Sequence, residues 1–469
     1  MTLPDHLLIA SVSGLRGLVG RGLDPVVASR FVAAYAAGLE PGGSIVLGHD
    51  ARLSHPVFRH AVAAALMASG FDVLDVGPIA TPSLGRYVRT SGSVGGIQIS
   101  ASHNPKEYNG LKFFQPDGVV LSPELGKAML DRFESESFRW ASLDDLGRET
   151  AIADADEDHI EAVCALTDVD LIASRQFRVL LDGCHGGGGP TLEKLLRRLG
   201  CQVIAIGTKP DGRYDHTPEP NVANLQVISR LMAGSNAFDL GFVLDPDADR
   251  LALLDSDGTF IGEEYTLVIA AAQRLKHGGP DGPLVANLST SAMIDAVAKA
   301  AGRTIVRSPV GEYHVVQALR QHGGIFGGEG NGGVIDPRVG WVRDSLLGAA
   351  LVLEALAEAP ANSSLQDLTR PWPTLVMVKD KIDLPAGGSA VANAALDTVA
   401  EEIGKSHPSA LIDRRDGLHV RLNDRTWLHL RASNTEPIVR ILLEAPDDRT
   451  ADDLRLTAKH MVIKAIERS

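Results

Sequence analysis

Residues 44–76 read SIVLGHDARLSHPVFRHAVAAALMASGFDVLDV, and this stretch contains the pattern on which most of the chain is built. An apolar strand over 44–50 is followed by a helix over 56–69, by Gly70 and by a second apolar strand over 71–76. Proline is tolerated in the first turn of a helix, and glycine just beyond its end adopts the left-handed conformation that closes it. The stretch therefore predicts a strand–helix–strand unit.

The same pattern returns twice further along the chain. The second copy has strands over 178–182 and 202–206 around a helix over 190–199, and the third has strands over 283–287 and 304–306 around a helix over 292–301. Gly200 and Gly302 are expected to close these helices as Gly70 closes the first. Strands that alternate with helices predict parallel or mixed sheets. We therefore expect three similar α/β domains.

The final part of the chain does not repeat this pattern. Pro371 and Pro373 mark a linker, after which strands are expected over 375–384, 418–422, 427–431 and 438–444, with helices over 390–403 and from 451. This order predicts a C-terminal α+β domain. A chain of 469 residues also exceeds the size at which a single hydrophobic core stops growing. The expected domains span residues 1–150, 151–257, 258–370 and 371–469.

The composition argues against several classes of protein. Hydrophobic residues make up 44% of the chain and charged residues 22%, which is typical of globular proteins and not of disordered or fibrous ones. The formal net charge of −14 argues against nucleic acid as a partner, because binding to a phosphate backbone needs an excess of Lys and Arg. The apolar stretches are too short for a membrane-spanning helix, and the first residues lack the basic region of a signal peptide.

The cysteines favour a reducing compartment. Cys164, Cys184 and Cys201 are odd in number, far apart and without a CxxC pair, so neither a disulfide framework nor a zinc site is expected. We therefore expect a cytoplasmic protein that acts on a small molecule, with neither a membrane nor a nucleic acid as partner. The sequence does not indicate the oligomeric state.

Each of the three repeated units continues into another apolar strand that ends in a distinctive loop. The strand over 96–99 leads into SASHNP at 100–105, the strand over 240–244 into DPDADR at 245–250, and the strand over 324–326 into GGEGNGG at 327–333. In open α/β sheets, ligands bind beyond the carboxyl ends of the strands. We therefore expect the three loops to meet in one cleft.

The first of these loops offers a hydroxyl group. Ser102 follows a buried strand in a turn favoured by Asn104 and Pro105, and such a turn exposes the hydroxyl group and points backbone N–H groups at an anion. His103 is not expected to pair with Ser102, because adjacent side chains in a strand or turn diverge. The alternative is that the Ser and Asn side chains only stabilise the turn.

The second loop offers three carboxylates. In an extended segment, Asp245, Asp247 and Asp249 project to one side and repel one another unless a cation lies between them. Oxygen ligands of this kind suit Mg²⁺. A calcium-binding EF-hand is excluded, because Arg250 and Ser256 stand where that motif needs Gly and Glu. The alternative is a solvated acidic turn.

The remaining candidates suit a phosphorylated sugar. Glu329 and Asn331 in the third loop suit recognition of hydroxyl groups, the alternative being a flexible glycine hairpin. The stretch RASNTEPIVR at 431–440 offers two guanidinium groups, hydroxyl groups and an amide, which match a phosphate dianion; the alternative is a capped turn beside surface arginines. Arg16, expected in a tight turn over 14–17, either serves the structure or reaches an anion.

One glycine-rich stretch is expected to be structural. Residues 183–189 precede a helix but lack the Gly-Lys-[Ser/Thr] of a nucleotide-binding loop, so close packing of strand and helix is the expected role. Cys184 and His185 within it adjoin one another only in sequence, which does not indicate a nucleophile and its base.

Taken together, these motifs resemble those of the α-D-phosphohexomutase family over essentially the whole chain. The matching motifs are GLRG at 14–17, ISASHNP at 99–105, NGLKFF at 109–114, HTPEPNVANL at 216–225, DPDADR at 245–250, the Gly-Glu loop at 327–333 and RASNTEPIVR at 431–440. The resemblance implies a heart-shaped enzyme with three similar mixed or parallel-sheet α/β domains and a C-terminal α+β domain. A hinge near Pro371 and Pro373 would let the fourth domain open and close.

The resemblance also implies roles for individual residues. Ser102 is implied to be a phosphoserine, and one Mg²⁺ per active site is implied to be bound by Asp245, Asp247 and Asp249 together with an oxygen on Ser102. Sugar hydroxyl groups are implied to be recognised by Glu329 and Asn331. The substrate phosphate is implied to be held by Arg431, Ser433, Asn434, Thr435 and Arg440. The reacting phosphoryl group is implied to be lined by Arg16, His103, Lys112 and Arg250, with Lys112 and His103 as candidates for proton transfer.

The implied reaction interconverts hexose 6-phosphate and hexose 1-phosphate. The phosphoserine donates its phosphoryl group to a sugar hydroxyl, which gives a hexose 1,6-bisphosphate that also serves as activator, and the other phosphate then returns to Ser102. Asn331 and Gly333 stand where members of the family often have Ser and His, so any role of that His is absent. This form, with SPVGE at 308–312, most resembles phosphoglucosamine mutases and some phosphomannomutase/phosphoglucomutase relatives. Glucosamine phosphate is therefore the expected substrate. The alternatives are a phosphomannomutase/phosphoglucomutase, a metal-dependent sugar phosphatase and a non-catalytic sugar-phosphate binder.

Overall fold

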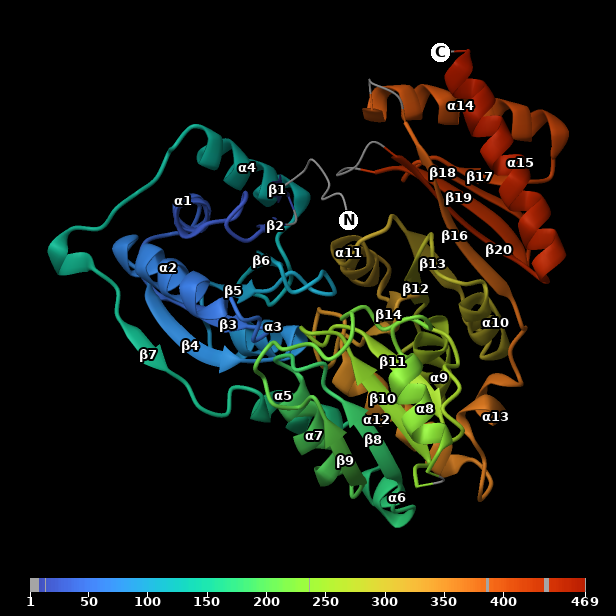
Figure 1. Ribbon diagram of the computed structural model, residues 1–469, viewed down its shortest axis with the longest axis horizontal. Coiled ribbons are helices and arrows are strands. Elements are labelled where there is room, and N and C mark those ends of the chain that lie inside the picture. Colours follow the sequence, from blue (N-terminus) through green and yellow to red (C-terminus); the bar gives the residue numbers. More distant parts are fainter. Residues whose placement is uncertain (1–7, 13, 236, 385–387, 434–437, 469) are drawn as a thin grey trace. The chain divides into compact units, whose positions relative to one another are not determined.

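The computed structural model covers the whole chain and describes residues 8–12, 14–235, 237–384, 388–433 and 438–468 (Figure 1). The chain divides into two compact units, one of Met1–Gly279 with Ile325–Thr369 and the other of Pro280–Gly324 with Arg370–Ser469. We call them unit 1 and unit 2. Among the described residues, no helix combines the length and apolarity needed to cross a membrane.

The first sheet of unit 1 has, in the described part of the chain, seven strands in the order β1-β2-β6-β5-β3-β4-β7. The strands are β1 (Leu8–Ser11), β2 (Gly14–Leu18), β3 (Ser44–His49), β4 (Asp72–Pro78), β5 (Gly95–Ile99), β6 (Tyr108–Phe114) and β7 (Glu149–Ala151). Strand β3 pairs parallel with β4 and β5, whereas β6 pairs antiparallel with β5 and β2. The sheet is therefore mixed.

Helices cover both faces of this sheet. Apolar side chains of α1 (Pro25–Ala36), α2 (His55–Ala68) and α4 (Pro123–Glu134) share one buried cluster with Ile45 and Leu47 of β3. The intervening Val46 points to the other face, where it packs with Leu84 and Val88 of α3 (Thr81–Thr90). This alternation along β3 is the period-two pattern of a strand that is buried on both faces.

The second sheet of unit 1 has the order β11-β10-β8-β9. Its strands are β8 (Arg178–Asp182), β9 (Gln202–Ile206), β10 (Leu240–Leu244) and β11 (Leu251–Asp255), and only the β10–β11 pair is antiparallel within this part of the described chain. Its helices are α5 (Glu157–Cys164), α6 (Val169–Ser174), α7 (Gly189–Arg198) and α8 (Gln226–Ala233). Strands β8 and β10 are buried at almost every position, as expected for strands covered on both faces.

Unit 1 is completed by a hairpin and a buried helix. Strands β14 (Phe326–Glu329) and β15 (Gly333–Ile335) pair antiparallel. Helix α12 (Ser345–Glu358) is buried around almost its whole circumference, because its sequence SLLGAALVLEALAE is apolar on every side. It packs against α9 (Glu264–Lys276), and the short α13 (Leu365–Thr369) follows it.

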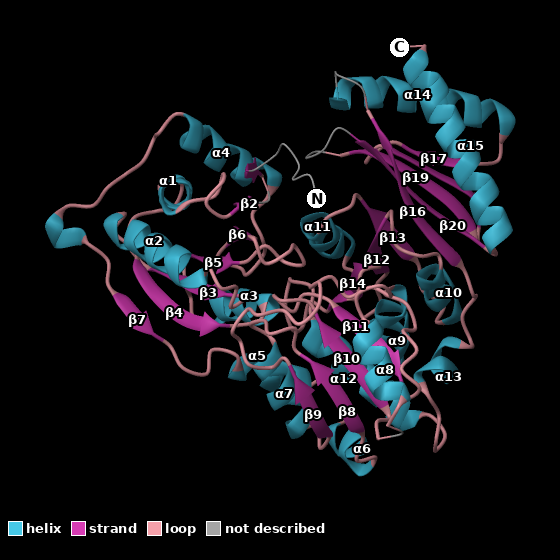
Figure 2. Ribbon diagram, in the orientation of Figure 1, coloured by secondary structure: helices cyan, strands magenta, loops and turns pink. Residues whose placement is uncertain are grey.

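Unit 2 combines a parallel strand pair with an antiparallel sheet. Strands β12 (Leu284–Asn287) and β13 (Ile305–Ser308) are joined by α10 (Met293–Ala300) and followed by α11 (Glu312–His322). The C-terminal sheet has the order β16-β20-β19-β18-β17, from β16 (Val376–Asp383), β17 (Leu411–Asp413), β18 (Leu418–Asn423), β19 (Thr426–Ala432) and β20 (Ile438–Ala445). Figure 2 shows α14 (Gly388–Ser406) and α15 (Asp448–Glu467) packed on one face of this sheet.

The three repeats predicted from the sequence are present. The strands expected over 178–182, 202–206 and 240–244 have these bounds in the structure. Gly70, Gly200 and Gly302 have φ angles of +84°, +80° and +66°, which is the left-handed conformation expected beyond a helix end. The predicted fold class, α/β domains with mixed sheets followed by a C-terminal α+β part, is confirmed.

Two local predictions are wrong. Arg16 does not lie in a tight turn, because residues 15–18 pair with β6 and form part of strand β2. The strand expected to end at 326 continues to Glu329, because Gly327, Gly328 and Glu329 pair with β15. Glu329 is therefore held at the end of a paired strand.

Candidate active site

The three carboxylates predicted as metal ligands do meet, although not in an extended segment. Residues 245–250, which we call the acidic loop, form a turn after β10 in which Ala248 has a φ of +54°. Oxygen atoms of Asp245, Asp247 and Asp249 lie within 4.8 Å of one another, and all three side chains are buried. The three carboxylates were expected to share one side of an extended segment, but in the structure a turn brings them together.

Glycines make this turn possible. Residues 183–189, which we call the glycine loop, lie against the acidic loop, and Gly187 N–H donates to the carbonyl of Pro246 at 2.9 Å. A Cβ on Gly186 would lie 2.2 Å from the carbonyl oxygen of Pro246, and one on Gly188 would lie 2.2 Å from Cβ of Ala248. The glycine loop therefore serves close packing, as predicted, and it packs against the acidic loop as well as between strand and helix.

Two cations neutralise part of the acidic cluster. Lys112 on β6 donates to Asp247 and, at 3.1 Å, to Asp249, and Arg343 donates to Asp249 at 2.6 Å. Burial alone would raise the pKa of Asp249, but Arg343 and Lys112 hold that pKa well below its usual value. Asp245 differs, because burial and the charges of Asp249 and Asp247 raise its pKa well above the usual value. The raised pKa shows that the protein's own cations do not compensate the charged form of Asp245, which a bound cation would stabilise.

The donor set fits a divalent cation. Oδ1 of Asp247 and Oδ1 of Asp249 are buried and have no hydrogen-bond partner within the described structure. Leaving a buried carboxylate oxygen without a partner is costly, and three close carboxylates of this kind are the hard oxygen ligands that Mg²⁺ prefers. Asp245, Asp247 and Asp249 are therefore well suited to hold a cation.

The Ser102 hydroxyl lies directly beside this cluster. Ser102, on the serine loop (residues 100–105), is 4% exposed, and its Oγ donates to Asp245 at 3.2 Å. The same Oγ lies 3.2 Å from Nδ1 of His103. The prediction that these adjacent side chains diverge is wrong, because Ser102 has a φ of +50° and this left-handed conformation turns the two side chains together.

Two other predicted basic residues, Arg16 and Arg250, lie near His103. Arg16 on β2 donates to Oδ1 of Asn104 at 2.8 Å, and Nε of Arg250 is buried without a hydrogen-bond partner in the described residues. Burial lowers the pKa of His103 to about 3, and the charges of Arg250 and Arg16 act in the same direction. The imidazole is therefore neutral beside a group of permanent cations.

The sugar-recognition candidates belong to the same unit. Asn331 donates to Glu329 at 3.2 Å, and Oδ1 of Asn331 is buried without a partner among the described residues. Arg343, which binds Asp249, also pairs with Glu329 at 2.9 Å. Leu251, just after the acidic loop, donates its N–H to the carbonyl of Gly332 at 3.1 Å. Glu329 and Asn331 are thus connected to the acidic loop through Arg343 and through the backbone.

The predicted phosphate-binding residues belong to unit 2. Arg431 on β19 lies directly opposite Arg440 on β20, so their side chains project from the same face of the sheet. Asp416 accepts from Arg431 at 2.8 Å and from the backbone N–H of Val310 at 2.8 Å. Ser433 N–H donates to the carbonyl of Ile438 at 2.9 Å. Asn434 and Thr435 lie outside the described residues.

Sequence reasoning missed a buried arginine that holds the serine loop. Arg52 is fully buried, forms an ion pair with Asp50 at 2.9 Å, and donates to the carbonyls of Ser102, Asn104 and Pro105. Its segment follows β3 at the carboxyl end of that strand. The rule that ligands bind beyond the carboxyl ends of strands would therefore also have drawn attention to Arg52. Arg343 was also missed, and its position before α12 gives no comparable signal.

Comparison with known proteins identifies the family. Family models for phosphoglucomutase/phosphomannomutase match alpha/beta/alpha domain I at residues 8–140, domain II at 157–258, domain III at 262–375 and the C-terminal domain at 386–458. The chain is 34% identical over 456 residues to a Methanopyrus kandleri protein named "Probable phosphoglucosamine mutase", covering 97% of this chain and 98% of the relative. It is also 34% identical over 443 residues to a "Phosphoglucomutase/phosphomannomutase" of Thermococcus kodakarensis, covering 93% and 94%.

The fold is likewise that of a solved member. A phosphoglucomutase/phosphomannomutase family protein from Burkholderia thailandensis matches with a TM-score of 0.83 at 24% identity, covering 97% of both chains. Repeated α/β domains with a serine hydroxyl beside an acidic cluster define a phosphoryl-transfer enzyme of the phosphohexomutase class. The chain belongs to the phosphoglucomutase/phosphomannomutase family, whose members are isomerases that move a phosphoryl group within a hexose phosphate.

Replacing Arg52 by Lys is expected to loosen the serine loop. Lysine keeps the charge but cannot reach three carbonyls and a carboxylate with one planar group, so we expect a loss of about 2 kcal/mol in local stability. Hydrogen exchange followed by mass spectrometry should show faster exchange over residues 100–108. Arg59→Lys is the matched control, since Arg59 pairs with Asp75 and Glu149 away from this loop. Unchanged exchange over 100–108 would show that Arg52 does not hold the loop.

Replacing Gly186 by Ala is expected to destabilise unit 1. The added Cβ would meet the Pro246 carbonyl oxygen at 2.2 Å, so one of the two loops must move, at a cost of about 1–3 kcal/mol. Denaturant unfolding followed by circular dichroism measures this loss. Gly340→Ala is the control, because a Cβ there meets nothing within 4 Å. Equal stability of the two variants would contradict the packing argument.

Proposed function

We propose that this enzyme works through a phosphorylated Ser102 and a hexose 1,6-bisphosphate intermediate, with glucosamine phosphate as its substrate. The observation that carries the proposal is the position of the Ser102 hydroxyl, 3.2 Å from Asp245 in a buried cluster in which two carboxylate oxygens have no hydrogen-bond partner among the described residues. A structural serine would not need such surroundings, whereas a phosphoryl carrier needs a cation beside it. The four domains are proposed to span residues 1–150, 151–257, 258–370 and 371–469.

The roles of the surrounding groups follow from charge. When bound by Asp245, Asp247 and Asp249 together with an oxygen on Ser102, Mg²⁺ supplies positive charge next to the phosphoryl group. Arg16, Arg250 and Lys112 are proposed to add charge from the protein itself.

The transfer exchanges one P–O bond for another. The bond between phosphorus and Ser102 Oγ breaks, a bond forms from phosphorus to a sugar hydroxyl oxygen, and the hydroxyl proton passes to a protein group. His103 is the candidate to accept that proton, because its imidazole is neutral and its Nδ1 lies 3.2 Å from Oγ. Lys112, whose charged ammonium group donates to Asp247 and Asp249, is the candidate to donate a proton when the reaction runs the other way. In the second half of the reaction the other phosphate returns to Ser102, so added hexose 1,6-bisphosphate is proposed to act as activator.

The sugar and its second phosphate are proposed to be held by separate groups. The carboxylate of Glu329 and the free Oδ1 of Asn331 are acceptors, which suit hydroxyl groups and the ammonium group of glucosamine alike. The phosphate that is not being transferred is proposed to bind the opposed guanidinium groups of Arg431 and Arg440. Ser433, Asn434 and Thr435 are proposed to complete this phosphate site.

A direct assay tests the substrate assignment. Purified protein with Mg²⁺ and glucose 1,6-bisphosphate is incubated with the 6-phosphates of glucosamine, glucose and mannose, and the 1-phosphates are followed by ³¹P NMR. The highest kcat/KM is expected for glucosamine 6-phosphate. A preference for mannose or glucose phosphate would correct the sugar, and phosphate release without any 1-phosphate would favour a phosphatase.

Ser102→Ala is expected to abolish turnover while the fold is kept. The variant lacks the oxygen that carries the phosphoryl group. The removed hydroxyl group is small and its hydrogen-bond partners are the polar groups of Asp245 and His103, so the free energy of unfolding should change little. Incubation with glucose 1,6-bisphosphate should add about 80 Da to wild-type protein and nothing to the variant, as intact mass spectrometry shows. Ser137→Ala, which removes an exposed hydroxyl group from the same unit, is the control and should keep both turnover and the mass gain. Wild-type kcat in the Ser102 variant would refute the proposed carrier.

Asp247→Asn is expected to weaken metal binding by about tenfold or more, because it removes one of three carboxylate ligands. Titration of activity with Mg²⁺ and direct binding of Mn²⁺ by electron paramagnetic resonance both measure the change. Asp257→Asn removes an exposed carboxylate of the same unit and should leave both titrations unchanged. The same metal affinity in both variants would show that the cluster is not the metal site.

A further inference from the structure

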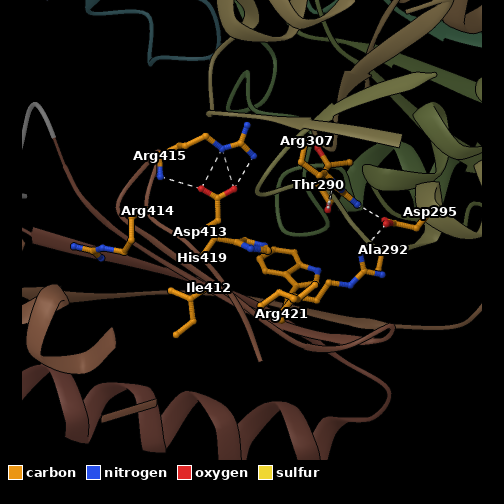
Figure 3. A pocket seen from close by; sticks show the side chains of 12 residues that line it. Thr290, Ala292, Asp295, Arg307, Ile412, Asp413, Arg414, Arg415, His419 and Arg421 are labelled. Carbon is orange, nitrogen blue, oxygen red and sulfur yellow. Dashed lines mark hydrogen bonds and ion pairs between the residues drawn. The ribbon is translucent and has the colours of Figure 1, made fainter. Parts of the chain in front are cut away.

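Unit 2 contains a cavity of about 580 Å³ that the proposed reaction does not use (Figure 3). It lies on the face of the C-terminal sheet that is turned away from α14 and α15, because its strand residues alternate with those of the buried cluster beneath the helices. The opposite wall comes from the loop before α10 and from β13. The described residues that line it include none of Arg431, Ser433 and Arg440.

Two arginines lie at the base of the cavity. Asp295 accepts from Arg421 at 3.0 Å and also from Arg307, so two guanidinium groups share one carboxylate, as the dashed lines in Figure 3 show. Burial alone would raise the pKa of Asp295, but Arg307 and Arg421 hold that pKa below its usual value. Arg421 also pairs at 3.3 Å with Asp424, whose carboxylate is 87% exposed, so an incoming anion competes for this half-buried guanidinium group with a solvated carboxylate. The two guanidinium groups offer donors to a small anion.

A flat aromatic wall stands beside these charges. The rings of His419 and Trp427 are stacked, with centroids 5.4 Å apart and planes 28° from parallel. The indole N–H of Trp427 donates to Glu444 at 2.8 Å, and Glu444 also accepts from the N–H of Ala292 at 2.8 Å, so the indole is fixed in place. The His419 imidazole makes no hydrogen bond within the described structure. Its nitrogens are therefore available to a ligand.

The mouth of the cavity is lined by exposed arginines and by an exposed apolar side chain. Arg415 is 56% exposed and pairs with Asp413, and Arg414 pairs with the exposed Asp397. Exposed ion pairs of this kind contribute little to stability, so both guanidinium groups can turn towards an incoming anion. Leu411 beside them is 69% exposed although it is aliphatic. The cavity thus offers guanidinium groups for an anion and flat or apolar surfaces for what the anion is attached to.

We propose that this cavity is a second ligand site, which binds a small phosphate monoester that carries a ring. The phosphate faces Arg421, Arg307 and the arginines of the mouth, and the ring lies along His419, which is backed by the buried Trp427. Ligands with this chemistry come from two sources, sugar phosphates and nucleoside monophosphates, and both fit a cavity of this volume. None of the residues that line the cavity takes part in the proposed reaction, so binding to the cavity does not depend on that reaction.

Equilibrium dialysis of the full chain with glucose 6-phosphate and with adenosine 5′-monophosphate distinguishes the two sources. If the cavity accepts sugar phosphates, glucose 6-phosphate is expected to bind there at one site per chain, in addition to any molecule bound at the Ser102 site. If the cavity accepts nucleotides, adenosine 5′-monophosphate is expected to bind at one site. Either result supports the proposal when the cavity variants remove that binding. Dialysis needs no turnover, so failure of the proposed reaction does not affect the outcome.

Two variants connect the binding to the cavity. Arg421→Gln removes one of the two base charges and should weaken cavity binding about tenfold or more. Arg415→Gln changes an exposed side chain at the mouth and should weaken it about threefold without a change in the fold. Arg449→Gln removes the same charge from an exposed position of unit 2 outside the cavity and should change nothing. Circular dichroism checks that each variant is folded. If Arg421→Gln does not fold, the binding measured for Arg415→Gln tests the proposal.

Two outcomes overturn the proposal. In the first, neither probe shows cavity binding, with no adenosine 5′-monophosphate bound and no glucose 6-phosphate beyond any at the Ser102 site up to about 10 mM, where even weak sites fill. In the second, the additional ligand binds as tightly to both cavity variants as to the Arg449→Gln control, which would place it elsewhere on the chain.

Discussion

The mutual repulsion of three buried carboxylates is the constraint on which this active site depends. Asp245, Asp247 and Asp249 have oxygen atoms within 4.8 Å of one another in a place with little water to screen them. Lys112 and Arg343 offset two of the three charges, and they come from different parts of unit 1. Breaking a buried pair leaves an uncompensated charge. The acidic loop, strand β6 and the start of α12 are therefore bound together by charge as well as by packing.

Much of this arrangement could be predicted, because the site residues lie in loops that directly follow strands which the sequence indicates clearly. The strands over 178–182 and 240–244 are continuous apolar runs bounded by polar residues, and such runs in an α/β pattern leave little choice of structure. The loops after β5, β10 and β14 were then singled out by their position at strand ends together with their polar, acidic or glycine-rich sequences. Ser102 and the three aspartates were found in this way, and the structure places them together, although their roles stay predictions.

What could not be predicted depends on contacts between residues far apart in sequence. Arg343 binds Asp249, and the two residues are 94 positions apart, so no local pattern indicates the pair. The left-handed conformations of Ser102 and Ala248 are equally hidden, because neither is glycine and the surroundings impose them. Two of the errors about local geometry, the divergence of His103 and the extended acidic segment, have this same cause.

The glycine-rich loop at 327–333 shows how contacts between distant residues determine the structure of a sequence that is ambiguous on its own. Read alone, GGEGNGG is compatible with a flexible hairpin. In the structure, a Cβ on Gly330 would lie 2.0 Å from the carboxylate of Glu264, and one on Gly332 would lie 2.5 Å from the carbonyl of Leu251, so these glycines permit close packing. Arg343 binds Glu329 and Asp249 at once. The carboxylate proposed to recognise the sugar is thus fixed relative to the acidic cluster by a single guanidinium group.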